Sequence, residues 1–93
     1  GCYSILNKGS GLALDVSNGI AEDCRNVQQY TFNGTNAQRW KIEDNGDGTV
    51  TILSAINGHY ALDALDGAAE RGTNIQIYHT NGTPAQRWVL SKS

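Results

Sequence analysis

Residues 13–40 read ALDVSNGIAEDCRNVQQYTFNGTNAQRW, and residues 61–88 read ALDALDGAAERGTNIQIYHTNGTPAQRW. The two stretches align without a gap at a spacing of 48 residues, and 16 of the 28 paired positions are identical. A period of this length indicates a fold built from one repeated unit, which cannot bury its apolar face alone. Polar residues kept in both copies therefore point to a chemistry that occurs twice.

The bulk properties of the chain exclude several classes of partner. Its 93 residues suffice for one small domain. The formal net charge of −2 gives no electrostatic reason to expect nucleic acid or an anionic membrane. No apolar run approaches the roughly 18 residues that span a bilayer. The chain begins at Gly1 without a methionine or a signal-peptide pattern, so we expect a processed piece of a longer protein.

The two cysteines do not belong to the repeated design. Cys2 and Cys24 both lie in the first copy, opposite Val50 and Gly72 of the second. Two cysteines make neither a disulfide framework nor, by themselves, a zinc site. Two unpaired thiols and one mutual bridge both remain open, and no cofactor is expected.

Turn signals dominate the sequence, and no apolar stripe at helical spacing persists. Asn-Gly or Asp-Gly pairs favour tight hairpin turns of type I′, because both central residues need positive φ. The pairs stand at 18–19, 33–34, 45–46, 47–48, 57–58, 66–67 and 81–82. Eight strand-like runs lie around them, at 3–6, 12–16, 26–31, 40–42, 50–53, 60–64, 75–78 and 88–90. We therefore predict an all-β domain with four strands in each repeat.

Side chains alternate between the two faces of a strand, which separates packing from chemistry. Ile75 and Ile77 should face the core, while Gln76 and Tyr78 face the other way. The same alternation places a carboxylate, an amide and an aromatic ring on the outer face of each copy. These residues are Asp15, Gln28 and Tyr30 in the first copy, and Asp63, Gln76 and Tyr78 in the second.

The Gln-x-Trp motif occurs twice, at 38–40 and 86–88, each time after Leu-Asp and Gln-x-Tyr at the same spacing. This pattern resembles the repeat of ricin-type lectins, a family that includes carbohydrate-binding module family 13, over essentially the whole chain. The resemblance implies a β-trefoil, in which three four-stranded units surround a pseudo-threefold axis and each unit can carry one shallow sugar site. Two units are present here, residues 1–46 and 47–93. We expect the third from the same parent chain, lost upstream of Gly1, or from a homotrimer whose three chains share six units.

The resemblance also assigns roles to residues. The family's sugar-binding Asp falls on Asp15 and Asp63, its aromatic residue on Tyr30 and Tyr78, and the polar residue before it on Gln28 and Gln76. The motif Gln falls on Gln38 and Gln86, and the motif Trp, a core residue, on Trp40 and Trp88. Asn33 and Asn81 begin an Asn-Gly-Thr turn that also matches a glycosylation sequon, and they are further candidates for sugar contact.

Two departures from the family bear on specificity and stability. Ala37 and Ala85 stand where galactose-binding members have Asn, which removes one hydroxyl ligand. Many members bridge two cysteines at positions that here hold Ala13 and Phe32.

The proposed site has a physical logic of its own. An ionised Asp accepts hydrogen bonds from neighbouring sugar hydroxyls, and a Tyr ring offers a flat surface to sugar C–H groups. Together with the resemblance, this chemistry predicts a lectin domain for galactose-, arabinose- or xylose-containing glycans. The resemblance further implies that such a module targets an attached secreted glycan-degrading enzyme. A trefoil scaffold for protein–protein contact, with vestigial sugar sites, is the alternative. Because surface changes cost little, we expect Ala at the ring and carboxylate positions to leave the fold intact.

Other readings are disfavoured. Asp15 and Asp63 lie on different lobes, whereas the carboxylates of a glycosidase stand about 5–10 Å apart, so no enzyme is expected. His59 and His79 have no histidine counterpart and are expected to be ordinary surface residues. The acidic run 43–48 lacks the later Glu of a calcium loop and is expected to be a polar connector.

Overall fold

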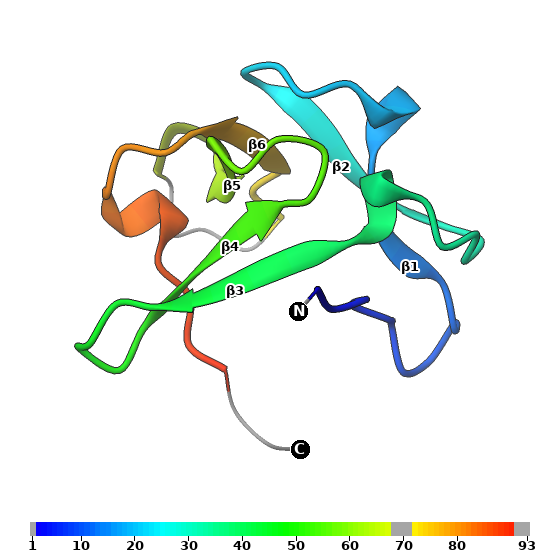
Figure 1. Ribbon diagram of the computed structural model, residues 1–93, viewed down its shortest axis with the longest axis horizontal. Helices are drawn as coiled ribbons and strands as arrows, with labels where there is room; N and C mark the ends of the chain where they lie inside the picture. The colour runs from blue at the N-terminus through cyan, green and yellow to red at the C-terminus, as the bar shows by residue number, and fades with distance from the viewer. Residues whose placement is uncertain (1, 68–71, 91–93) are drawn as a thin grey trace.

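A computed structural model describes residues 2–67 and 72–90 of the chain (Figure 1). Within them, six strands form one antiparallel sheet in the order β1-β2-β6-β5-β4-β3. The strands are β1 (Ala13–Val16), β2 (Arg25–Tyr30), β3 (Trp40–Asp44), β4 (Val50–Ser54), β5 (Tyr60–Ala64) and β6 (Ile75–His79). Four single 3-10 turns follow strands or precede them: η1 (Ser17–Gly19), η2 (Asn36–Gln38), η3 (Leu65–Gly67) and η4 (Pro84–Gln86). The predicted all-β class is confirmed, and none of the described helices is long and apolar enough to cross a membrane.

Two of the eight predicted strands are not formed as ladders. The segment 3–6 makes only single bridges, from Tyr3 to Trp40 and from Leu6 to Ala13. The segment from Trp88 onward makes one, to Val50. In both repeats the bridge is a reciprocal pair of backbone hydrogen bonds, at 2.7 and 2.8 Å for Tyr3 with Trp40 and at 2.8 and 2.9 Å for Val50 with Trp88. A strand needs consecutive partners, and these segments have them at isolated residues only.

Each repeat contributes one hairpin, and the two hairpins are joined side by side. Strands β1 and β2 pair in the first repeat, and β5 and β6 pair in the second. Strand β2 then pairs with β6 through Arg25 with Ile77 and Asn26 with Gln76, so the first repeat lies directly against the second (Figure 1).

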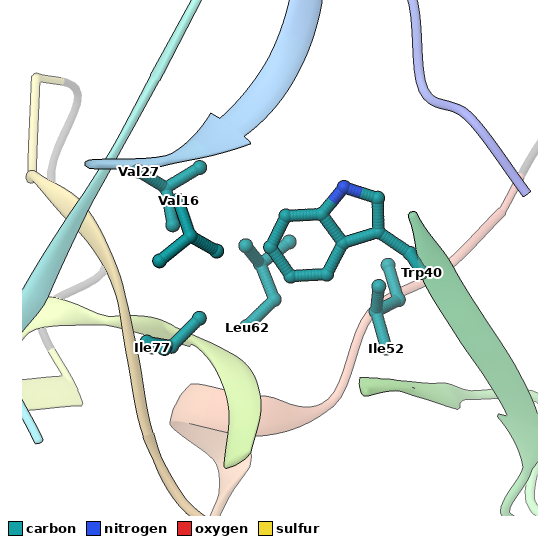
Figure 2. Packing of buried hydrophobic residues seen from close by; sticks show 6 residues of the cluster. All are labelled: Val16, Val27, Trp40, Ile52, Leu62 and Ile77. Atoms are coloured by element: carbon teal, nitrogen blue, oxygen red, sulfur yellow. The ribbon is translucent and has the colours of Figure 1, made fainter. Parts of the chain in front are cut away.

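The core lies between the curled strands and draws on both repeats. Figure 2 shows its six buried members converging: Val16, Val27, Trp40, Ile52, Leu62 and Ile77. The prediction that Ile75 and Ile77 face the core is confirmed, with Ile77 fully buried in this cluster and Ile75 partly buried against it. Trp40 is also fully buried, and its indole Nε1 donates to the Leu14 carbonyl at 3.2 Å. Trp88 repeats this bond to the Leu62 carbonyl at 3.1 Å but is only half-buried.

The predicted two-residue type I′ hairpin turns are wrong, because the loops between paired strands hold five residues or more. Asn18 and Gly19 both have positive φ, at 58° and 64°. At Asn33-Gly34 only the glycine does, because the Asn33 side chain bonds within its own loop, with Oδ1 accepting from the Thr35 amide at 3.1 Å. The turns between paired strands are therefore wider than the type I′ turns predicted from sequence.

Candidate functional site

Each hairpin holds a surface hollow next to its 3-10 turns. The first has a volume of about 560 Å³ and is lined by Asp15, Asn18, Gly19, Gln28, Tyr30, Asn33, Thr35, Asn36, Ala37 and Ile56. The second has a volume of about 520 Å³ and is lined by Cys24, Asp63, Leu65, Gly67, Gln76, Tyr78, Asn81, Thr83, Pro84 and Ala85. The two hollows are built from matching positions of the two repeats, so the predicted polar residues gather twice, as expected.

A carboxylate lines each hollow and is held between two glutamine side chains. The hairpin register sets Asp15 opposite Gln28, and Gln28 Nε2 donates to Asp15 Oδ1 at 3.2 Å. The other carboxylate oxygen accepts from Gln38 Nε2 at 2.9 Å. Asp63 repeats this arrangement with Gln76 at 3.2 Å and Gln86 at 3.0 Å. Each carboxylate keeps lone pairs for further donors, since one oxygen can accept more than one hydrogen bond.

Gln38 lies beneath the hollow and uses its whole amide within the protein. It is fully buried, and its Nε2 also donates to the Thr31 carbonyl at 2.9 Å. Its Oε1 accepts from the Asn33 backbone amide at 2.8 Å. Gln86 makes the same set of bonds, to Asp63, to the His79 carbonyl and from the Asn81 amide, each at 3.0 Å. The geometry gives these two glutamines the task of holding the carboxylate and the neighbouring loop in place.

The rim of each hollow carries the predicted Asn and Tyr. The Asn33 Oδ1 accepts from the Thr35 hydroxyl at 2.8 Å, and Asn81 and Thr83 repeat this bond at 2.8 Å. The Asn-Gly-Thr sequence therefore forms the turn that it predicts, with its Asn at the edge of the hollow. Tyr30 is 53% exposed, whereas Tyr78 is half-buried.

One premise drawn from sequence is wrong. Asp15 and Asp63 were expected to lie on the exposed face, but they are only 6% and 5% exposed, and Gln76 is 5% exposed. The 3-10 turns η2 and η4 pack against β1 and β5 and cover the two carboxylates. A side chain on the outer face of the hairpin is therefore buried at these positions. Removing a buried carboxylate leaves the glutamine N–H donors around it without an acceptor. Replacement of Asp15 or Asp63 by Ala is therefore not a surface change.

Sequence reasoning missed the residues that each repeat lends to the other. Ile56 of the second repeat lines the first hollow, and Cys24 of the first lines the second. Neither position is repeated, so no pattern marked them. Both cysteines are exposed and free, which settles the choice left open between thiols and a bridge.

His79 was expected to be an ordinary surface residue, yet it ties the repeats together at the second hollow. Its backbone amide donates to Asp23 Oδ1 at 2.9 Å, and its ring Nδ1 lies 3.0 Å from Asp23 Oδ2. The backbone hydrogen bond is the largest cause that lowers the pKa of Asp23, with the His79 ring adding to it. The ring centroid also lies 4.5 Å from that of Tyr78, with the planes tilted by 32°.

The acidic run between the repeats is a structured connector. Asp44 Oδ1 accepts from the Gly46 amide at 2.7 Å, and Asp47 Oδ2 accepts from Arg87 Nη1 at 3.0 Å. The hydroxyl and the amide of Thr49 are the main causes that lower the pKa of Asp47. Among the residues placed by the structure, no three His, Cys, Asp or Glu side chains cluster as metal ligands would.

Comparison with solved structures identifies the fold. ThreeFoil, a designed three-fold symmetric protein, is 34% identical, with a TM-score of 0.96 over 100% of this chain and 66% of its own. An exo-β-1,3-galactanase from Clostridium thermocellum is 38% identical, with a TM-score of 0.90 over 96% of this chain and 19% of its own. A Polyporus squamosus lectin shares the fold at 22% identity, with a TM-score of 0.79 over 95% of this chain and 30% of its own.

The chain therefore spans less than two thirds of each of these proteins. No curated protein matches it significantly. The family model for ricin-type β-trefoil lectin-like domains matches residues 1–78. With its all-β curled sheet and two hollows at the positions of the Leu-Asp, Gln-x-Tyr and Gln-x-Trp motifs, the chain belongs to the ricin-type β-trefoil lectin-like family.

Proposed function

We propose that each hollow binds one sugar residue of a glycan, and that the chain is a carbohydrate-binding module with two sites. The observation that carries this proposal is the repeated pairing of a buried, oriented carboxylate with a tyrosine ring at the rim. The carboxylate accepts hydrogen bonds from sugar hydroxyls, and the ring covers a C–H face at little entropic cost. Membership of a lectin-like family supports the same role.

Within the ten candidate residues, we propose two kinds of role. Asp15, Gln28, Tyr30 and Asn33, with Asp63, Gln76, Tyr78 and Asn81, line the hollows and contact the sugar. Gln38 and Gln86, whose amides are used up by protein partners, act by fixing the carboxylate.

The proposed ligand class follows from the alanines that stand in the walls of the hollows at positions 37 and 85. The methyl groups of Ala37 and Ala85 lie beside Gly19 and Gly67. Each is 3.8 Å from the position that a Cβ atom would take on that glycine. An Asn amide is missing from this wall, so a hydroxyl pointing at it loses a bond worth about 0.5–1.5 kcal/mol. We therefore propose arabinose- and xylose-containing polymers beside galactans as ligands. The similarity to part of an exo-β-1,3-galactanase makes galactan one of the probes.

The same similarity supports a targeting role. The chain covers 19% of that galactanase, and 96% of the chain is matched there. We propose that this chain likewise serves as a module of a secreted glycan-degrading protein and holds it at its polysaccharide. Two shallow sites reinforce each other through effective concentration when one polymer reaches both.

We also propose that a third unit completes the barrel. The segments 3–6 and 88–90 pair at isolated residues, and the apolar side chains near them are exposed: Tyr3 56%, Leu6 54%, Val89 74% and Leu90 58%. Unpaired backbone and uncovered apolar side chains favour association. The match to 66% of the three-fold symmetric ThreeFoil supports two units of three. The third comes from the same parent chain or from a homotrimer.

A glycan array followed by affinity electrophoresis in galactan, arabinan and xylan tests the proposed function. We expect retention by at least one polymer, and loss of that retention in a Tyr30→Ala, Tyr78→Ala double variant. An array without any glycan signal, from folded protein, would favour a scaffold for protein–protein contact instead.

A further inference from the structure

We propose that the hollow around Asp63 is a site built from two repeats, in which Cys24 of the first repeat decides which sugar is accepted. This inference rests on the proposed function and deepens it for one of the two hollows. Cys24 lines the hollow together with Asp63, Gln76 and Tyr78, although it precedes them by 39 to 54 residues in the chain.

The pairing of β2 with β6 brings Cys24 to this place. The Cys24 amide donates to the Ile77 carbonyl at 3.0 Å, just before Arg25 pairs with Ile77 in the ladder. Gln76 and Tyr78, the neighbours of Ile77 on β6, face the hollow. Strand alternation therefore sets the Cys24 loop beside two of the residues that would contact a sugar.

Asp23 fastens the same loop a second time. It accepts from the His79 amide at 2.9 Å and lies 3.0 Å from the His79 ring. The His79 ring lies against the Tyr78 ring, and the His79 backbone carbonyl accepts a hydrogen bond from Gln86 Nε2. The loop of the first repeat, the ring of Tyr78 and the glutamine that holds Asp63 thus form one connected set of contacts.

The backbone at Cys24 is in a conformation that glycine adopts at no steric cost. Its φ is 64°, and Gly72, its counterpart in the second repeat, has a φ of 83°. Cys24 and Asn18 are the non-glycine residues with positive φ in the described part of the chain. A non-glycine side chain held at positive φ carries a steric cost, which motivates the hypothesis that this side chain has a use. Here the exposed thiol forms part of the wall of the hollow.

The chemistry of this wall favours a sugar edge that carries few hydroxyls. A thiol is a weak hydrogen-bonding group and behaves as a small apolar side chain. Pentoses such as xylose and arabinose in their pyranose rings present a bare CH₂ where galactose carries a hydroxymethyl group. The wall therefore discriminates for pentose residues and against hexoses. The hollow around Asp15 takes Ile56 from the second repeat instead, so the two sites differ in preference.

The test isolates the second hollow by using a Tyr30→Ala chain, whose first hollow lacks its ring. NMR titration with free xylose, arabinose and galactose gives three dissociation constants and their ratios. We expect Cys24→Gly to weaken pentose binding about three- to fivefold, as loss of one small buried contact does, and to shift the ratio toward galactose. Because glycine relieves the strain, the melting temperature should stay equal or rise, so that a loss of binding is not a loss of fold.

Matched variants complete the test. Cys24→Ser keeps the size of the wall but replaces the weakly bonding thiol by a hydroxyl, so it should shift the pentose-to-galactose ratio toward galactose. Cys2→Ser, at the other exposed cysteine, should change nothing. Asp23→Ala frees the loop and should shift the pentose-to-galactose ratio in the direction of Cys24→Gly. Asp47→Ala, which breaks another exposed ion pair, should not. The readout for Asp23 as a positioning residue is the pentose-to-galactose ratio of dissociation constants. General destabilisation of the fold does not change this ratio.

The outcomes separate two failures. If the Tyr30→Ala chain binds a sugar and Cys24→Gly leaves all three constants unchanged, the two-repeat site is refuted while the proposed function stands. If neither that chain nor the parent binds any of the three sugars, both ideas fall together. Alkylation gives an independent reading: carbamidomethylation of Cys24 in a Cys2→Ser chain should block the second hollow, and xylose should slow the modification.

Discussion

Asp63 combines two tasks that usually fall to different residues. It is nearly buried and accepts hydrogen bonds from Gln76 and Gln86, so it organises the interior of its hollow. It also retains acceptor capacity toward the open side. The ring of the matching tyrosine is freer, since Tyr30 is 53% exposed at the first hollow. We therefore expect stability and the proposed sugar binding to be coupled at the carboxylate and separate at the ring.

Replacing the carboxylate should cost both properties. In Asp63→Ala, one N–H of Gln86 and one of Gln76 lose their acceptor in a buried place. We expect the free energy of unfolding to fall by about 1–3 kcal/mol, and sugar binding at this hollow to disappear. Tyr30→Ala should abolish binding at its own hollow with a change of at most about 0.5 kcal/mol. Urea denaturation with sugar titration measures both, and equal stability of Asp63→Ala and the parent would contradict this coupling.

The clamp between Asp23 and His79 should respond to acid. The hydrogen bond from the His79 amide holds the pKa of Asp23 below its ordinary value of 3.8. A depressed carboxyl pKa means that the contact is fully present above 3.8 and is lost as the pH falls through the lower pKa. The Asp23 carboxyl carbon and the His79 amide should therefore shift together below pH 3.8 in an NMR titration. In Asp23→Asn the amide shift should vanish, and a His79 amide that still follows this transition would contradict the clamp.

At the scale of elements, the two hairpins line the hollows, whereas the outer segments are held to the sheet by isolated bridges only. Strands β5 and β6 pair over five residue pairs, whereas the segments 3–6 and 88–90 make single bridges. The link between β2 and β6 is short, with two residue pairs, but it brings the first repeat to the second hollow.

Hydrogen exchange should reproduce this hierarchy. Amides of β5 and β6 that point into their shared ladder should exchange slowest, close to the rate of global unfolding. Amides of Tyr3 and Trp88 should exchange faster through local opening, because few neighbouring bonds must break with theirs. Exchange measured by NMR at several urea concentrations separates the two classes. Equal protection of Trp88 and Tyr78, whose amide points toward β5, would show that the outer segments are as firmly held as the hairpins.

For the whole molecule, the two tryptophans report on completeness. Trp40 is fully buried while Trp88, its counterpart in the second repeat, is half-buried beside exposed Val89 and Leu90. The same motif therefore sits in two environments. A third unit packed against the segments 3–6 and 88–90 would cover the exposed side of Trp88. The environments of the two tryptophans would then be alike.

Adding a third unit should stabilise the fold. A chain with residues 47–93 appended once more should be monomeric and melt at a higher temperature. It should also show blue-shifted Trp88 emission when Trp40 and the appended copy of Trp88 are both replaced by Phe. The 93-residue chain should instead associate, and a trimer in light scattering would match three chains that share six units. A 93-residue chain that stays a stable monomer at high concentration would contradict the need for a third unit.

Sequence alone determined what depends on local pattern. The 48-residue repeat and its turns predicted an all-β chain with matching hairpins, and alternation along β6 put Ile77 in the core and Gln76 on the other face. The same pattern named the Asp, Gln and Tyr that gather in each hollow, because cross-strand neighbours follow from hairpin register. These features depend only on residues close together in the sequence and on the 48-residue repeat.

The tertiary structure alone decided what depends on contacts between the repeats. The burial of Asp15 and Asp63 comes from loops folding around the hairpins, which alternation cannot express. Cys24 reaches the second hollow, and Asp23 reaches His79, because β2 pairs with β6, and neither Cys24 nor His79 is repeated in the chain. The single bridges at Tyr3 and Trp88 likewise depend on which neighbours are present, not on strand propensity. A repeat predicts its own unit, whereas the packing of one unit on the next joins residues about 50 positions apart through side chains that the repeat does not share.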